Sequence, residues 1–163
     1  MVAEREYIIK MLKESGIKSQ VYTTMKKLKQ GNELHVGAVL QSSDTFNRSG
    51  SKKSYIDQEG QRKRRVKLWD RITVLHVVIA DTSEEKVEEI LEKFLRKLKK
   101  GIPVEGNWVN IIVGAADWVE EDDSILKAKV AVQFDITFEG GIYEDREMKE
   151  MEIGTVRNGG QSG

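Results

Sequence analysis

The sequence of 163 residues contains no cysteine, one proline and only two histidines, His35 and His76. The absence of cysteine excludes a disulfide scaffold, a thiolate metal site and a cysteine nucleophile. A zinc site needs three or more suitably spaced ligands, which two separate histidines do not supply. His76 lies among apolar neighbours in an expected strand, which favours a hydrogen-bonded structural role over catalysis. We therefore expect neither a metal nor a cofactor.

The chain also has no excess charge of either sign and no long apolar run. Lysine plus arginine and aspartate plus glutamate number 27 each, so no overall field attracts the chain to nucleic acid or to an anionic membrane. No apolar segment approaches the ~20 residues of a membrane span, and the first residues lack the pattern of a signal peptide. We expect a cytoplasmic protein, or one that leaves the cell only at lysis.

Motifs that would indicate an enzyme are missing as well. The sequence has no nucleophile elbow, no phosphate-binding Walker loop and no dinucleotide fingerprint. The acidic cluster at residues 120–123 lacks the alternating ligands and central glycine of a calcium loop, and is more typical of a solvated turn. The expected function is therefore not catalytic.

The clearest structural pattern lies within residues 71–101. Residues 72–79 form a β-branched run, typical of a strand covered on both faces. A helix is expected over residues 82–100, with Thr82 and Glu85 as a capping box and Gly101 as a left-handed residue beyond the last turn. The helix would bury one apolar stripe at helical spacing: Val87, Ile90, Leu91, Phe94, Leu95 and Leu98.

Shorter elements surround this pair. A short helix is expected over residues 3–15 and strands over 17–25, 33–41 and 108–113. Residues 126–139 alternate between apolar and polar, which predicts a strand with one buried and one wet face, ended by Gly140 and Gly141. This order predicts an α+β fold, with an antiparallel or mixed sheet and a long amphipathic helix (about 82–100) and a short N-terminal helix packed on one face. We expect one domain over residues 1–143 and a C-terminal tail or arm over 144–163.

Residues 42–60 are rich in serine and also contain aspartate, asparagine, glycine and lysine. A segment of this length and composition forms either a long hairpin extension or a mobile loop, and long loops are usually functional or disordered. Its aromatic and cationic side chains are candidates for contacts between subunits: Phe46, Arg48, Lys52, Lys53 and Tyr55.

A basic run follows, with five cations in six positions: Arg62, Lys63, Arg64, Arg65 and Lys67. The run favours either a patch that meets phosphates or an acidic partner, or a strand start whose charges prevent unwanted edge pairing. Only Tyr55 and Trp69 are near enough in sequence to stack on bases, so DNA as passing cargo is favoured over sequence-specific recognition. Lys127 and Lys129, on the wet face of the last strand, are further candidates for partner or lumen contacts, although ordinary solvent exposure is slightly favoured for this polar row.

The order of elements resembles that of the tail terminator, or tail completion, proteins of bacteriophages and phage-like particles. The resemblance is carried by the short N-terminal helix, the strands with a long loop, the capped helix at 82–100, a Trp-containing strand, and a long alternating strand that closes in Phe138-Glu-Gly-Gly-Ile-Tyr143. It covers residues 3–143 and is architectural, since no family motif fixes single residues.

The resemblance implies a structural virion protein. Members of the family form a homohexameric ring that caps the tail tube, ends its polymerisation and offers an attachment surface to head or sheath. It implies the tube protein as partner, with the sheath protein and the head–tail connector as further partners, and no membrane. The setting would be the cytoplasm during assembly and then a phage virion or a headless tail-like bacteriocin. The alternatives are another head–tail joining or tube-like assembly protein, or a small nucleic-acid-binding module or enzyme that uses the basic strand.

Overall fold

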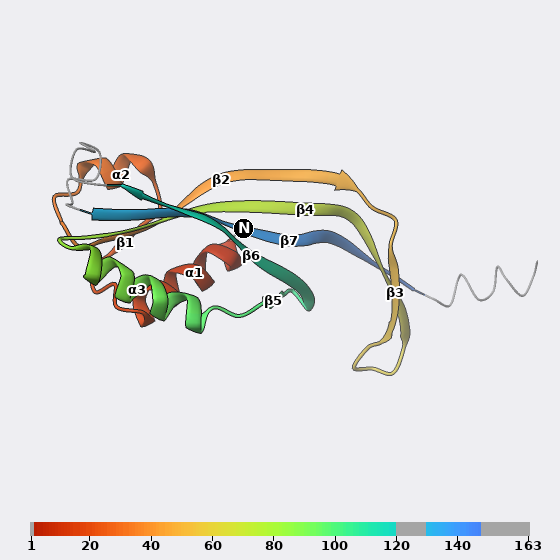
Figure 1. Ribbon diagram of the computed structural model, residues 1–163. Helices are drawn as coiled ribbons and strands as arrows, with labels where there is room; N and C mark the ends of the chain where they lie inside the picture. The colour runs from red at the N-terminus through yellow and green to blue at the C-terminus, as the bar shows by residue number, and fades with distance from the viewer. Residues whose placement is uncertain (1, 120–129, 148–163) are drawn as a thin grey trace, which may run out of the picture. The chain divides into compact units, whose positions relative to one another are not determined.

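The computed structural model describes residues 2–119 and 130–147 (Figure 1). The elements follow in the order α1 (Val2–Glu14), β1 (Val21–Tyr22), α2 (Met25–Gln30), β2 (Val36–Arg48), β3 (Lys52–Ile56), β4 (Arg62–Asp81), α3 (Glu84–Lys97), β5 (Gly101–Val104), β6 (Asn107–Val119) and β7 (Val130–Glu147). The strands form one sheet in the order β1-β2-β4-β7-β6-β5, with β3 also paired to β4. Strand β1 pairs with β2 in parallel, whereas β6 pairs antiparallel with both β5 and β7. The fold is therefore α+β with a mixed sheet, as the sequence predicts.

The chain divides into two compact units. Unit 1 comprises residues 1–44 and 72–140, and unit 2 comprises residues 45–71 and 141–163. Strands β2, β4 and β7 each contribute residues to both units. The expected domain of residues 1–143 with a tail at 144–163 stays a prediction, although residues 144–147 belong to β7.

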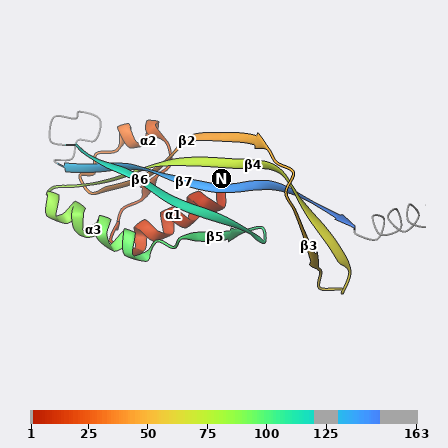
Figure 2. The same cartoon turned by 45° about the vertical axis from the view of Figure 1, so that its right-hand side comes forward.

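Unit 1 has its main core between the sheet and the two longer helices. Figures 1 and 2 show α1 and α3 on the same side of the sheet. Phe94 of α3 meets Phe134 of β7 with ring centroids 5.8 Å apart. The buried side chains of this core include Ile8, Leu12, Leu75, Val77, Val87, Ile90, Val109, Ile136 and Phe138. We call this side of the sheet the helix face and the opposite side the outer face.

Helix α3 is shorter than predicted, since it spans 14 residues instead of residues 82–100. Its N-cap is Ser83, whose hydroxyl accepts a hydrogen bond from the Lys86 amide, so the expected capping box of Thr82 and Glu85 is wrong. Gly101 is not a left-handed residue after the helix, because it already pairs with Asn110 as the first residue of β5. The helical pattern predicted a helix to residue 100, but the pairing of β5 with β6 begins at Gly101 and the helix ends before it.

A second, smaller core lies on the outer face under α2. Leu28 of this helix packs with Val36, Ala38, Leu40, Val78, Ala80 and Ala131. The helix is capped by Thr24, whose side chain accepts a hydrogen bond from the Lys27 amide. The predicted strand over residues 17–25 is reduced to the two residues of β1, and the chain continues into α2, for which no helix was predicted.

The long loop expected at residues 42–60 consists largely of strand, because β2 continues to Arg48 and β3 returns along β4. The hairpin alternative therefore describes this segment. The predicted strand stop at Gly140 and Gly141 is also wrong, since β7 continues to Glu147. A Cβ at position 140 would lie 3.1 Å from a methyl group of Val109, so a larger residue there would require Val109 to shift. Residues 120–129, which include the expected acidic turn and the start of the last strand, lie outside the described residues. No helix within the described ranges is long and apolar enough to cross a membrane.

Candidate functional site: the basic hairpin of unit 2

The basic run lies at the start of β4, where it pairs with β3. Residues 63, 64 and 65 are opposite Tyr55, Ser54 and Lys53 in an antiparallel register. Because side chains alternate along a strand, the run is divided between two faces. Lys63, Arg65 and Lys67 share what we call the first face, with Lys53 and Tyr55, whereas the second face carries Arg62, Arg64, Lys52 and Ile56. The expected single patch of five cations is therefore two patches.

Cations on the first face pair with carboxylates. Arg65 binds Asp145 through two hydrogen bonds, Nε to Oδ1 at 2.8 Å and Nη2 to Oδ2 at 3.2 Å. Lys63 Nζ lies 3.4 Å from Asp57 Oδ2, and Lys67 Nζ lies 2.8 Å from Asp70 Oδ1. Apart from Lys53, the cations of this face are therefore held beside opposite charges.

Two carboxylates of this face, Asp57 and Asp145, have lowered pKa values. The hydrogen bond from Arg65 lowers the pKa of Asp145, and the Gln61 amide, together with Lys63, lowers the pKa of Asp57. The hydrogen bond to Asp57 in turn raises the pKa of Lys63. Groups whose charged forms are stabilised in this way are poor proton donors or acceptors near neutral pH.

Every aromatic side chain in the described part of unit 2 lies beneath a cation. Arg48 lies 4.5 Å from the ring centroid of Trp69, Arg65 lies 5.0 Å from that of Tyr55, and the remaining pairs are Arg71 with Phe46 at 5.6 Å and Lys67 with Tyr143 at 5.9 Å. Each such contact contributes about 0.5–1 kcal/mol at an exposed site. The residue types are evident from the sequence, but their pairing depends on the register of β2, β3, β4 and β7.

The remaining sequence candidates differ in their surroundings. Among the described residues, Lys52, Lys53 and Arg64 make no ion pair with a carboxylate. Lys127 and Lys129 lie outside the described residues, so the expected polar row on the last strand begins at Gln133. Residues 45–71 together carry nine lysines and arginines against three aspartates and glutamates, which makes this segment strongly basic within a neutral chain.

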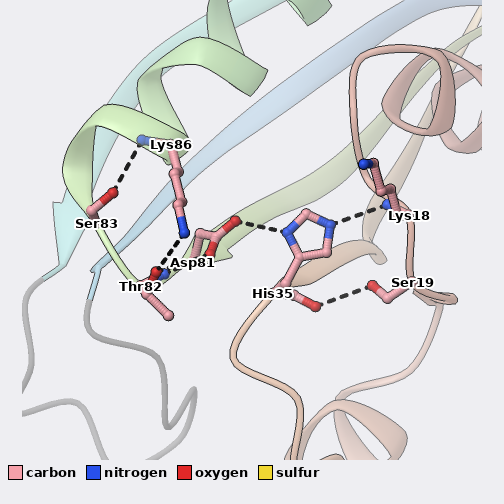
Figure 3. A network of polar contacts seen from close by, with 7 residues as sticks. All are labelled: Lys18, Ser19, His35, Asp81, Thr82, Ser83 and Lys86. Atoms are coloured by element: carbon pink, nitrogen blue, oxygen red, sulfur yellow. Dashed lines mark hydrogen bonds and ion pairs between the residues drawn. The ribbon is translucent and has the colours of Figure 1, made fainter.

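Both histidines have structural hydrogen bonds in unit 1. His76 Nδ1 lies 2.8 Å from Asp135 Oδ1 and its Nε2 lies 2.9 Å from Gln133 Oε1, so it joins β4 to β7. His35 belongs to the network of Figure 3, in which its Nδ1 lies 2.7 Å from Asp81 Oδ2 and its Nε2 accepts the Lys18 amide at 3.1 Å. Over residues 2–119 and 130–147, no group of three or more metal-ligating side chains is arranged to hold an ion.

The exposed aromatic and apolar residues of β6 were not singled out as a site from the sequence. Trp108, Ile112 and Trp118 are all exposed. The sequence feature that could have identified this surface is the absence of lysine and arginine over residues 101–119.

Comparison of the chain with models of known protein families and with curated protein sequences gave no match.

Proposed function

We propose that this chain is a structural subunit of a bacteriophage tail or tail-like particle, which forms a homohexameric ring that caps the tail tube. The ring would end tube polymerisation and present an attachment surface to head or sheath, as in the tail terminators that the order of elements resembles. The observation that carries the proposal is the concentration of cations in residues 45–71, on a hairpin ordered by ion pairs and cation–aromatic contacts.

The chemistry of the hairpin supports a structural contact. Arg65 holds both Tyr55 and Asp145, so its guanidinium fixes strands that are distant in sequence. A surface that is ordered before binding loses less conformational entropy when it meets a partner.

Two measurements test the proposal. Light scattering behind a sizing column gives the mass of the protein in solution at several concentrations, and electron microscopy images the protein after it has been mixed with purified tails. We expect six-fold rings, free or at the ends of tubes, in the cytoplasmic extract as well as on finished particles. A chain that remains monomeric and ignores tube ends would contradict the proposal.

Nucleic-acid binding is the second candidate, and the lack of carboxylate partners for Lys52, Lys53 and Arg64 favours it. Phosphate contacts release counterions, so binding would weaken steeply with added salt. The triple substitution R62A/R64A/R65A should then abolish binding to RNA and single-stranded DNA. Retention of affinity in this variant would exclude the basic run as a nucleic-acid site.

A further inference from the structure

Strands β5, β6 and β7 of unit 1 expose an apolar surface on the outer face. Val109 and Ile111 point to the helix face, where they join the core. The alternating residues Trp108 and Ile112 therefore point to the outer face, where they are 58% and 49% exposed. Glu139 of β7 is opposite Asn110 of β6, so its side chain lies on the same face of the sheet as those of Trp108 and Ile112. We call the surface made by Trp108, Ile112, Asp135 and Glu139 the acidic–aromatic face.

The Trp108 ring is held in a fixed position on this face. Its indole N–H donates a hydrogen bond to Asn110 Oδ1 at 2.9 Å. The ring covers Gly101, because a Cβ at that position would lie 2.6 Å from two indole carbons. One side of the indole thus rests on the backbone of β5 while the side chain stays more than half exposed. A rigid exposed indole loses little entropy on binding, as is typical of interface anchors.

The strand segments that form this surface contain acidic residues but neither lysine nor arginine, and one of the acids, Asp135, pairs with His76 of β4. Residues 101–119 and 130–140 contain four carboxylates, Glu105, Asp117, Asp135 and Glu139, and neither lysine nor arginine. Residues 45–71 have the opposite character, with nine cations against three anions. Each chain therefore carries two surfaces of complementary charge.

We propose that the acidic–aromatic face binds the second face of the hairpin of another copy of this chain. Lys52 and Arg64 of the hairpin have no carboxylate partner among the described residues, and Ile56 beside them is 66% exposed. A cation from this face would lie over Trp108 next to Glu139, and Ile56 would meet Ile112. The chemistry repeats that of unit 2, where each described aromatic ring lies beneath a cation.

Such a contact joins two different surfaces, so it is heterologous. Heterologous contacts generate closed rings or open filaments, whereas a contact of one surface with itself stops at a dimer. The inference rests on the proposed self-association into a ring, and it adds the two surfaces that would meet.

Two variants test the contact, each disabling one surface. Trp108→Ala removes the anchor of the acidic–aromatic face, and K52E/R64E reverses the charge of the hairpin. We expect each variant alone to lose association by about 30-fold or more, as for the truncation of an interface anchor. An equimolar mixture should form dimers and nothing larger, because it contains one intact pair of surfaces. Glu139→Lys serves as a second face variant if Trp108→Ala does not fold, with folding checked by circular dichroism.

Matched controls change the same residue types elsewhere. Trp118→Ala removes another exposed tryptophan of β6, which the pairing with Val132 places on the helix face. Lys97→Glu reverses an exposed cation of α3. Both should associate like the wild type, and a loss as large as that of the test variants would overturn the assignment.

The outcomes separate this inference from the proposed function. A wild-type chain that stays monomeric at its highest soluble concentration, or variants that associate normally, would overturn the inference. A mixture of the two variants that does not form dimers would also overturn it. If both variants still cap tube ends in electron micrographs, the proposed function stands and the assignment of the two surfaces is wrong. If the variants lose association as expected but the wild-type chain does not cap tubes, the assignment of the surfaces stands and the proposed function fails.

Discussion

The Lys18 amide donates a hydrogen bond to Nε2 of His35, at 3.1 Å. Because an amide N–H is always a donor, Nε2 must be unprotonated and the ring proton must lie on Nδ1. That proton points to Asp81 Oδ2, 2.7 Å away. A backbone group thus fixes the tautomer of His35, and His35 joins the start of β2 to the end of β4.

Replacing Asp81 with asparagine should destabilise unit 1. Asp81 is buried and also accepts the Thr82 amide at 2.7 Å. An asparagine can keep that bond, but its NH₂ group would then face the Nδ1 proton of His35. We expect a loss of about 1–3 kcal/mol in the free energy of unfolding, measured by urea denaturation. The exposed Glu105→Gln is the control, and equal stabilities of the two variants would show that the pair contributes nothing.

The same pair should make stability depend on pH. Burial acts to raise the pKa of Asp81, but the hydrogen bonds from His35 and Thr82 outweigh it, so the net shift is downward. A lowered folded-state pKa gives stability that is complete above the unfolded value of about 3.9 and is lost as the pH falls through the folded pKa. The difference in unfolding free energy between the wild type and Asp81→Asn should therefore narrow below about pH 4. A difference that grows on acidification would reverse the assigned direction.

Arg65→Ala should loosen the hairpin without unfolding unit 1. The substitution removes both hydrogen bonds to Asp145 and the stack on Tyr55. Because the Asp145 side chain is 43% exposed, we expect the hairpin to lose only about 0.5–1 kcal/mol of stability against local opening. Hydrogen exchange of the β3–β4 amides measures the change, with the β6–β7 amides as an internal reference. Lys53→Ala, a neighbour on the first face, should leave exchange unchanged.

Gly101→Ala should displace the Trp108 ring. A Cβ at this position would lie 2.5 Å from the Val109 carbonyl oxygen and 2.6 Å from the indole. We expect destabilisation of about 1–3 kcal/mol and altered tryptophan fluorescence. Gly50→Ala is the matched control, because nothing lies within 4 Å of its added Cβ. Unchanged fluorescence in Gly101→Ala would show that the ring does not rest on this glycine.

Sequence patterns predicted the elements that have strong periodicity. Local residue order identified the β-branched run of β4 and the apolar spacing of α3. Residues 77–79 and Val87, Ile90 and Phe94 are buried as expected, whereas Ile72 and Val74 are half-buried and Leu95 of the expected stripe is 44% exposed. Helix α2 was missed because Leu28 is its only buried residue, so its sequence has no apolar stripe at helical spacing from which a helix could be predicted. The end of α3 was missed because pairing of Gly101 with Asn110 is a contact that no local pattern contains.

The candidate site was predictable by residue type and not by arrangement. The basic run was identified, but its division between two faces follows from the pairing of β3 with β4. The cation–aromatic pairs join residues such as Arg71 and Phe46, which are brought together only by strand register. The fixed position of Trp108 depends on Asn110 and Gly101, and neither residue is unusual in sequence.

The strand order also sets the timing of folding. Strands β4 and β7 are neighbours in the middle of the sheet, and the His76–Asp135 contact between them spans 59 residues of chain. Contacts between distant residues form slowly, because the entropy of loop closure must be overcome first. During synthesis on the ribosome, β6 emerges before β7, its partner, is complete. Its apolar segment is then exposed to other nascent chains, so the yield of folded protein should depend on how quickly the last third of the chain is made.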